Sequence, residues 1–122
     1  MRQRKRKANL TGGVAGTLMT NLGMEQALAA LGIPFARAAV GDRYVLENMN
    51  TNGHKLGGEQ SGHVILKEYA NTGDGILTAL HLMQVMAETK RELSDLAKVM
   101  SRFPQVLINV NDVEKSKLNT SV

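Results

Sequence analysis

Hydrophobic and polar residues follow one another along the chain in blocks that predict strands and helices in turn. The apolar run of small residues over 14–20 is typical of a buried strand, and Asn21 then precedes a helical pattern. From Met24 to Leu31 apolar residues recur at the spacing of one helix face, and Gly32 stands where a C-terminal cap is expected. This segment is therefore predicted to form a strand followed by a helix.

The next segment repeats this order. Residues 35–40 are a second strand candidate, which ends at Gly41. Asp42 can then cap a short helix whose apolar positions reach Met49. An Asn-Gly pair at 52–53 predicts a turn after this helix.

Two short apolar runs, 55–58 and 64–67, flank a polar loop and predict two strands or a hairpin. The longest predicted helix follows a polar cluster at 71–75, in which Thr72 or Asp74 can serve as the N-cap. One face of this helix carries apolar residues at helical spacing.

A further helix is predicted from Leu93 to Met100 and stops at the Phe-Pro pair 103–104. A β-rich run over 105–110 follows and is the last strand candidate. Alternating strands and helices predict an α/β fold, a three-layer α/β/α domain with a mostly parallel mixed sheet of about four strands. We expect this domain to occupy 10–111, between a basic connector at 1–9 and a polar tail at 112–122.

Composition narrows the class of protein. The chain has 122 residues, enough for one domain, and its 43% hydrophobic content is ordinary for a globular protein. It contains no Cys, which excludes a disulfide framework and thiolate chemistry and suits a cytoplasmic protein. Its longest weakly polar run is well short of the roughly 20 residues that cross a bilayer, so we expect no membrane partner.

The net charge of +4 arises from the start of the chain, where five Lys and Arg residues fall within 2–7. Without them the rest of the chain is nearly neutral. No apolar stretch follows as in a signal peptide, and no aromatic residues are interleaved for base stacking. A solvated connector is favoured over a nucleic-acid arm, and we expect no nucleic-acid partner.

The polar loop between the two short strands is the main candidate for chemistry. Its residues Glu59, Ser61 and His63 alternate, so in an extended backbone their side chains would lie on one side, with alternate Cα atoms about 6.5 to 7 Å apart. A Ser–His nucleophile is conceivable, but it needs the base within hydrogen-bond reach of the hydroxyl and an orienting acid behind it, a geometry that neighbours along one strand rarely give. A metal site would need a third ligand, for which Asp42, His54 or Asp74 have no spacing support.

Two other interpretations of this loop remain. Glu59 and Ser61 could simply cap a turn, which is a structural role. Ligand binding is favoured, because a carboxylate accepts two hydrogen bonds and a hydroxyl both donates and accepts, a combination that suits a polyol such as a sugar.

An ordered series of short motifs resembles the α-D-phosphohexomutases. The loop GGEQSGH at 57–63 is similar to the sugar-recognition loop of that family. The accompanying motifs are, in order, GGVAGTLM at 12–19, GIPF at 32–35, VGDRYV at 40–45, TGDGI at 72–76 and FPQV at 103–106. One glycine motif alone would be weak evidence, whereas the ordered series is specific.

The resemblance covers only the third of the family's four domains and is closest to the members that act on amino sugars. It implies an isomerase, an intramolecular phosphotransferase that interconverts glucosamine 6-phosphate and glucosamine 1-phosphate through a bisphosphate. The family uses a phosphoserine in its first domain, Mg²⁺ on an Asp-rich loop in its second and a phosphate-gripping loop in its fourth. None of these motifs occurs here. We therefore expect a fragment that binds no cofactor and has no turnover alone.

The resemblance carries over substrate-binding positions but no catalytic or metal-binding residue. They are Asp42, Arg43, Gly58, Glu59, Gln60, Ser61, Gly62 and His63. Glu59 and Ser61 are implied as ligands of the sugar hydroxyls, and Arg43 could meet a phosphate. The implied partners are a phosphorylated hexosamine and the remaining mutase domains. A stand-alone module that binds a phosphosugar or another partner without catalysis is the alternative.

Overall fold

A computed structural model describes residues 12–114 of the chain. The elements are β1 (Val14–Thr17), α2 (Leu22–Ala30), β2 (Phe35–Ala38), α3 (Asp42–Asn52), β3 (Leu56–Gly58), β4 (Val64–Leu66), α4 (Gly75–Thr89), α5 (Leu93–Leu96) and the 3-10 turn η1 (Ala97–Val99). The predicted basic connector and most of the polar tail lie outside the described residues.

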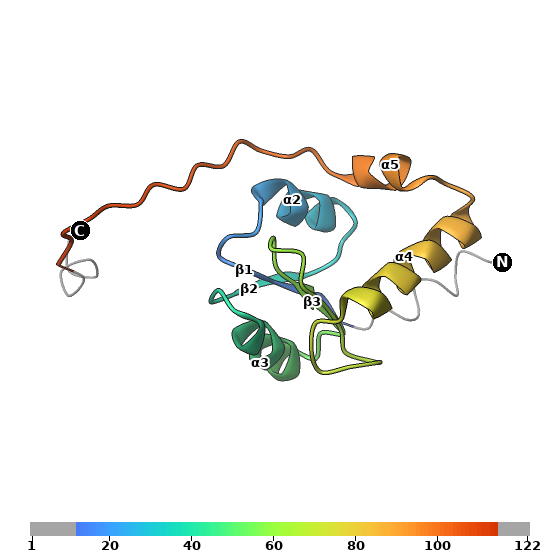
Figure 1. Cartoon of the computed structure of the whole chain (residues 1–122), viewed down its shortest axis with the longest axis horizontal. Coiled ribbons are helices and arrows are strands. Elements are labelled where there is room, and N and C mark those ends of the chain that lie inside the picture. Colours follow the sequence, from blue (N-terminus) through green and yellow to red (C-terminus); the bar gives the residue numbers. More distant parts are fainter. Residues whose placement is uncertain (1–11, 115–122) are drawn as a thin grey trace.

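Four strands form one mixed sheet in the order β2-β1-β3-β4. Strand β1 pairs in parallel with both β2 and β3, whereas β3 and β4 form an antiparallel hairpin. Figure 1 shows α2 and α3 on opposite sides of this sheet, with α4 beyond its β4 end. The predicted α/β fold, with helices on both faces of a mostly parallel sheet, is confirmed.

The core lies between the sheet and α3. Its buried hydrophobic members are Ala15, Ala38, Val45, Met49 and Ile65. Val45 and Met49 are fully buried on one face of α3, four residues apart, so they meet the sheet together. Small residues on β1 and β3 let this helix approach closely. A Cβ on Gly57 would lie only 2.5 Å from Met49 Sδ.

The structure corrects two details of the sequence prediction and decides a third. Residues 105–110 are not a strand of this sheet and carry no regular structure. Asp42 is the first residue of α3 rather than its cap, which is Gly41. Of the two candidates for the α4 cap, Asp74 takes the role, and its Oδ1 accepts a hydrogen bond of 2.9 Å from Leu77 N. No helix within residues 12–114 is long and apolar enough to cross a bilayer.

A buried histidine ties the strands together at their amino-terminal edge. His54 is only 7% exposed, and its Nδ1 accepts a hydrogen bond of 2.8 Å from Gly13 N, just before β1. This bond links the start of β1 to the start of β3. It also commits His54 to a structural role, before the start of β3 and at the opposite end of that strand from the polar loop.

We expect His54→Leu to lower the free energy of unfolding by about 1 to 3 kcal/mol, because it leaves the buried Gly13 N–H without its acceptor. Urea unfolding followed by circular dichroism measures this loss. His81→Leu is the matched control, because His81 lies on α4 in edge contact with Tyr69, outside the sheet. Equal losses in the two variants would contradict the role given to the Gly13 bond.

Candidate functional site

The polar loop is the tight turn of the β3–β4 hairpin. Glu59 N donates to His63 O at 2.9 Å, and Gly62 N donates to Glu59 O at 3.1 Å. Gly62 has a φ of 99°, a conformation that favours glycine. At Gly58 an added Cβ would lie 2.8 Å from His63 O. The two glycines therefore permit a turn in which Glu59 and His63 face each other across its base.

The extended, comb-like arrangement predicted for Glu59, Ser61 and His63 is wrong, because the backbone turns between them. Gln60 and Ser61 lie at the exposed tip of the hairpin. None of the hydrogen bonds within residues 12–114 joins Ser61 to His63, so nothing in this part of the chain supports a Ser–His nucleophile.

Strand topology brings a third side chain to this turn. Strands β2, β1 and β3 are parallel, so their carboxyl ends share one edge of the sheet. Asp42 follows the end of β2, and Glu59 follows the end of β3. In open α/β sheets this edge is the usual place for ligands. Glu59 Oε2 accepts a hydrogen bond of 3.3 Å from Gly41 N, which joins the hairpin to the start of α3.

Asp42, Glu59 and His63 form a compact cluster at this edge. One ligand atom from each of the three lies within 4.8 Å of the others. His63 Nδ1 is 3.3 Å from Asp42 Oδ1, an oxygen that is buried and makes no hydrogen bond of good geometry within residues 12–114. The His63 side chain is 63% exposed and that of Asp42 40%, so the cluster is open to solvent on one side.

The loop before α4 borders the same cluster. A Cβ on Gly73 would lie 3.5 Å from His63 Cβ and 3.7 Å from Asp42 Oδ2. Neither Gly73 nor the Gly41 N–H was predicted to take part in the site. The motif around 71–75 was noted in the sequence as a helix start, and its proximity to His63 depends on tertiary structure.

Other residues considered from the sequence lie outside the cluster. Arg43 is 82% exposed and pairs with Glu47 along α3, with Nε 3.0 Å from Glu47 Oε1. His54 bonds Gly13 at the opposite edge of the sheet, and Asp74 caps α4. Of the three candidates for a third metal ligand, only Asp42 therefore joins Glu59 and His63.

Two carboxyl groups dominate the electrostatics of the cluster. The pKa of Glu59 is raised above its usual 4.5, chiefly by a hydrogen bond to the carboxyl of Asp42, then by partial burial and repulsion from the Asp42 charge. The Gly41 N–H and the charge on His63 act in the opposite direction. The pair therefore holds a proton more readily than separate carboxyl groups would.

Because the pKa of Glu59 is raised by folding, we expect its contribution to stability to be complete below about pH 4.5 and to be lost as the pH rises through its folded-state pKa. Urea unfolding of the native chain and of Glu59→Gln, between about pH 4 and 7, measures the difference in stability. Relative to this variant, the native chain should lose stability as the pH increases. If the difference in stability between the native chain and Glu59→Gln stayed constant with pH, Glu59 and Asp42 would not share a proton.

The cluster offers acceptors for hydroxyl groups and, with Ser61 nearby on the same turn, a donor as well. Two carboxylates and an imidazole could also hold a divalent cation, since these are common oxygen and nitrogen ligands. The geometry of the cluster alone allows both kinds of ligand.

Residues 1–103 match the family model described as phosphoglucomutase/phosphomannomutase, alpha/beta/alpha domain III. The chain belongs to the phosphoglucomutase/phosphomannomutase family. Within this family the described fold is that of the third domain, as the motif series predicted.

Similar proteins agree with this membership. A phosphoglucosamine mutase of Nocardioides sp. is 59% identical over 104 residues, which are 85% of this chain and 23% of that protein. One from Streptomyces coelicolor is 53% identical over 118 residues, 97% of this chain and 26% of that protein. The chain thus spans about a quarter of these curated relatives.

A solved structure shows the same fold. The crystal structure of a protein from Thermus thermophilus, provisionally named a phosphomannomutase, superposes with a TM-score of 0.69 at 25% identity. The superposition covers 80% of this chain and 23% of that one. The part that matches this chain therefore belongs to a longer chain in that structure.

Proposed function

We propose that this chain is the sugar-binding domain of a phosphoglucosamine mutase. Its hairpin turn would grip the ring hydroxyls of glucosamine phosphates. The observation that carries the proposal is the placement of Glu59, which the glycine-framed turn holds at the carboxyl edge of the sheet, between the Gly41 N–H and the exposed Ser61. The curated relatives that match most of this chain are named phosphoglucosamine mutases.

The proposed reaction explains why a carboxylate and a hydroxyl suit this position. Between its two phosphoryl transfers, the bisphosphorylated sugar turns over so that C1 and C6 exchange places. The hydroxyls at C3 and C4 then roughly exchange as well. A carboxylate with two equivalent oxygens and a hydroxyl of either polarity can bind both poses. Because positioning does much of the work in phosphoryl transfer, such a clamp contributes to rate by orientation.

The remaining parts of the reaction are assigned to other domains. A phosphoserine, an Asp-rich Mg²⁺ loop and a phosphate-gripping loop are expected from the family, and this sequence has no motif for any of them. We propose that the chain works in the cytoplasm with those domains and that it has no isomerase activity alone.

Isothermal titration calorimetry of the full chain with glucosamine 6-phosphate at about millimolar concentration tests the binding proposal. We expect saturable binding, and inorganic phosphate at the same concentration should give a much smaller signal. Absence of binding to the phosphosugar would count against both the mutase domain and the stand-alone phosphosugar module. Recovery of isomerase activity when the other mutase domains are supplied would favour the mutase domain.

We expect EDTA to leave the affinity for glucosamine 6-phosphate unchanged, because in this proposal the side chains contact the hydroxyls directly. The measurement is the same titration with and without the chelator, followed by addition of Mg²⁺ or Zn²⁺. A loss of binding in EDTA that a divalent cation restores would instead show that Asp42, Glu59 and His63 hold a metal.

A further inference from the structure

The cluster at the carboxyl edge of the sheet holds two carboxyl groups that no Lys or Arg side chain balances. Within residues 12–114, neither Asp42 nor Glu59 forms an ion pair with a Lys or an Arg. Arg43 directly follows Asp42, yet its guanidinium pairs with Glu47 one turn along α3. The basic group of the cluster is the imidazole of His63, whose Nδ1 lies 3.3 Å from Asp42 Oδ1. The cluster can therefore accept a cationic group from a ligand.

The two carboxyl groups oppose each other's ionisation. The pKa of Glu59 is raised first by its hydrogen bond to the carboxyl of Asp42, then by partial burial and by repulsion from the Asp42 charge. A positive charge placed against both groups would relieve this repulsion, because an opposite charge nearby favours the ionised form of a carboxyl group. A neutral hydroxyl would not. The electrostatics of the cluster therefore favour a cationic substituent over a hydroxyl in the same position.

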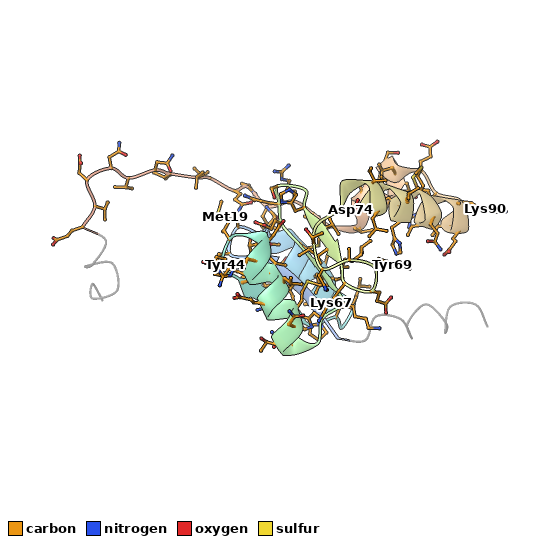
Figure 2. The ribbon with its side chains drawn as sticks, turned by 60° about the horizontal axis from the view of Figure 1, so that its bottom comes forward. Met19, Tyr44, Lys67, Tyr69, Asp74 and Lys90 are labelled. Carbon is orange, nitrogen blue, oxygen red and sulfur yellow. The ribbon has the colours of Figure 1, made fainter. Side chains whose placement is uncertain are left out.

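Gly73 leaves a small open space beside this pair of carboxyl groups. A Cβ on Gly73 would lie 3.5 Å from His63 Cβ and 3.7 Å from Asp42 Oδ2, which are ordinary contact distances. The Asp42 side chain is 40% exposed, so the space can be reached from solvent. Asp74 holds the loop in place by capping α4, and Figure 2 shows Asp74 at the end of α4 beside the body of the domain, with Lys90 at the far end. The space fits a group about as large as a methyl, and an ammonium group has that size.

A sugar bound by its C3 and C4 hydroxyls brings its C2 substituent to this space. Heteroatoms on neighbouring ring carbons lie about a hydrogen-bond length apart, and the carboxyl groups of Glu59 and Asp42 are also within hydrogen-bond reach of each other. A ring whose C3 hydroxyl meets Glu59 can therefore present its C2 substituent to Asp42. In glucosamine phosphates this substituent is an amino group. It is largely protonated at neutral pH if its pKa resembles that of an α-amino group, about 7.7 to 8.0.

We propose, on the basis of the proposed function, that Asp42 is a specificity-determining residue and accepts the ammonium group of an amino-sugar phosphate in the space beside Gly73. Glucose phosphates carry a neutral hydroxyl at the same carbon and gain less from the two carboxyl groups. Because the ring turns over between the two phosphoryl transfers, C2 lies on the Asp42 side in only one of the two poses. Asp42 thus contributes to the choice of substrate rather than to phosphoryl transfer itself.

The affinities of the full chain for two sugars test this proposal. Isothermal titration calorimetry with glucosamine 6-phosphate and with glucose 6-phosphate, at neutral pH and in EDTA, gives the ratio of their Kd values. We expect the native chain to bind the amino sugar about 10-fold more tightly, the effect of one hydrogen bond to a charged group. Equal affinities would overturn the role of Asp42 and leave the hydroxyl clamp in place. Absence of binding by both sugars would overturn this role together with the proposed function.

Two variants separate the charge of Asp42 from the space beside it. Asp42→Asn removes the charge and nearly conserves the shape of the side chain. Gly73→Ala keeps both carboxyl groups but fills the space, and Gly73 has no positive φ that would strain an alanine. Each variant should reduce the preference for the amino sugar from about 10-fold to about 2-fold or less, because the ammonium group loses its charged partner or its place.

Matched controls make the same chemical changes outside the space. Glu47→Gln neutralises an exposed carboxylate on the same helix as Asp42, and Gly75→Ala adds a Cβ that meets nothing within 4 Å. Both controls should keep the preference for the amino sugar. A preference that survives in folded Gly73→Ala would overturn the proposal, and so would one that survives in folded Asp42→Asn. Circular dichroism shows which variants are folded, and if Asp42→Asn unfolds, the result with Gly73→Ala decides.

Discussion

Glu59→Ala is expected to weaken the binding of glucosamine 6-phosphate by about 10- to 100-fold while the fold is retained, since hydrogen bonds to a charged group contribute roughly 1.5 to 3 kcal/mol. The carboxylate stands at the base of the hairpin turn, where its Oε2 accepts a hydrogen bond of 3.3 Å from Gly41 N. The same carboxyl group lies against Asp42 in the cluster. Calorimetry of the native chain and the variant measures the loss.

Glu47→Ala is the matched control for this experiment. Glu47 is also a carboxylate near the site, on the same helix as Asp42, but its partner is the exposed Arg43. Surface pairs of this kind contribute about 0 to 1 kcal/mol, so the control should keep both its fold and its affinity. If Glu59→Ala loses its circular dichroism signal, Glu59 is a structural cap of the turn. Unchanged affinity in a folded variant would remove Glu59 from the clamp.

Much of this fold could be predicted because its signals are local. The strand and helix order followed from apolar spacing, and the segments on both sides of the glycine-framed loop predicted two strands or a hairpin. The conformation of the turn was not predicted, because a polar alternation fits an extended strand as well. A residue with positive φ, Gly62, reverses the chain and turns an apparent comb into a cluster.

The meeting of Asp42 with Glu59 and His63 depends on topology rather than on spacing. The 20 residues between Asp42 and His63 show no period that would bring the two side chains together. A usable signal was available, because Asp42 and Glu59 each come just after a predicted strand, and the carboxyl ends of parallel strands lie at one edge of a sheet. The run at 105–110 shows the opposite case. Its residues have high β-propensity, yet they form no strand in the described chain, because propensity alone does not give a segment a neighbouring strand to pair with.

Met49→Ala is expected to lower the free energy of unfolding by about 2 to 5 kcal/mol, the range for truncating a buried large aliphatic side chain. Met49 is fully buried, and its sulfur fills the space that Gly57 leaves open on β3. The loss is a large part of the roughly 5 to 15 kcal/mol that stabilises a typical domain. Urea unfolding at fixed pH measures it, and Met49→Leu, which nearly conserves volume, should restore most of the stability.

Met83→Ala provides the control, because Met83 lies on α4 with 54% of its surface exposed. This substitution should lower the free energy of unfolding of the free chain only slightly.

The substitution of Met49 should also affect the site. Met49 packs α3 against β3 through Gly57, so it sets the separation between Asp42 at the start of α3 and Glu59 just after β3. We therefore expect folded Met49→Ala to bind glucosamine 6-phosphate more weakly as well, although it touches no ligand. Equal destabilisation by the two Met variants would show that the core does not lie between α3 and the sheet.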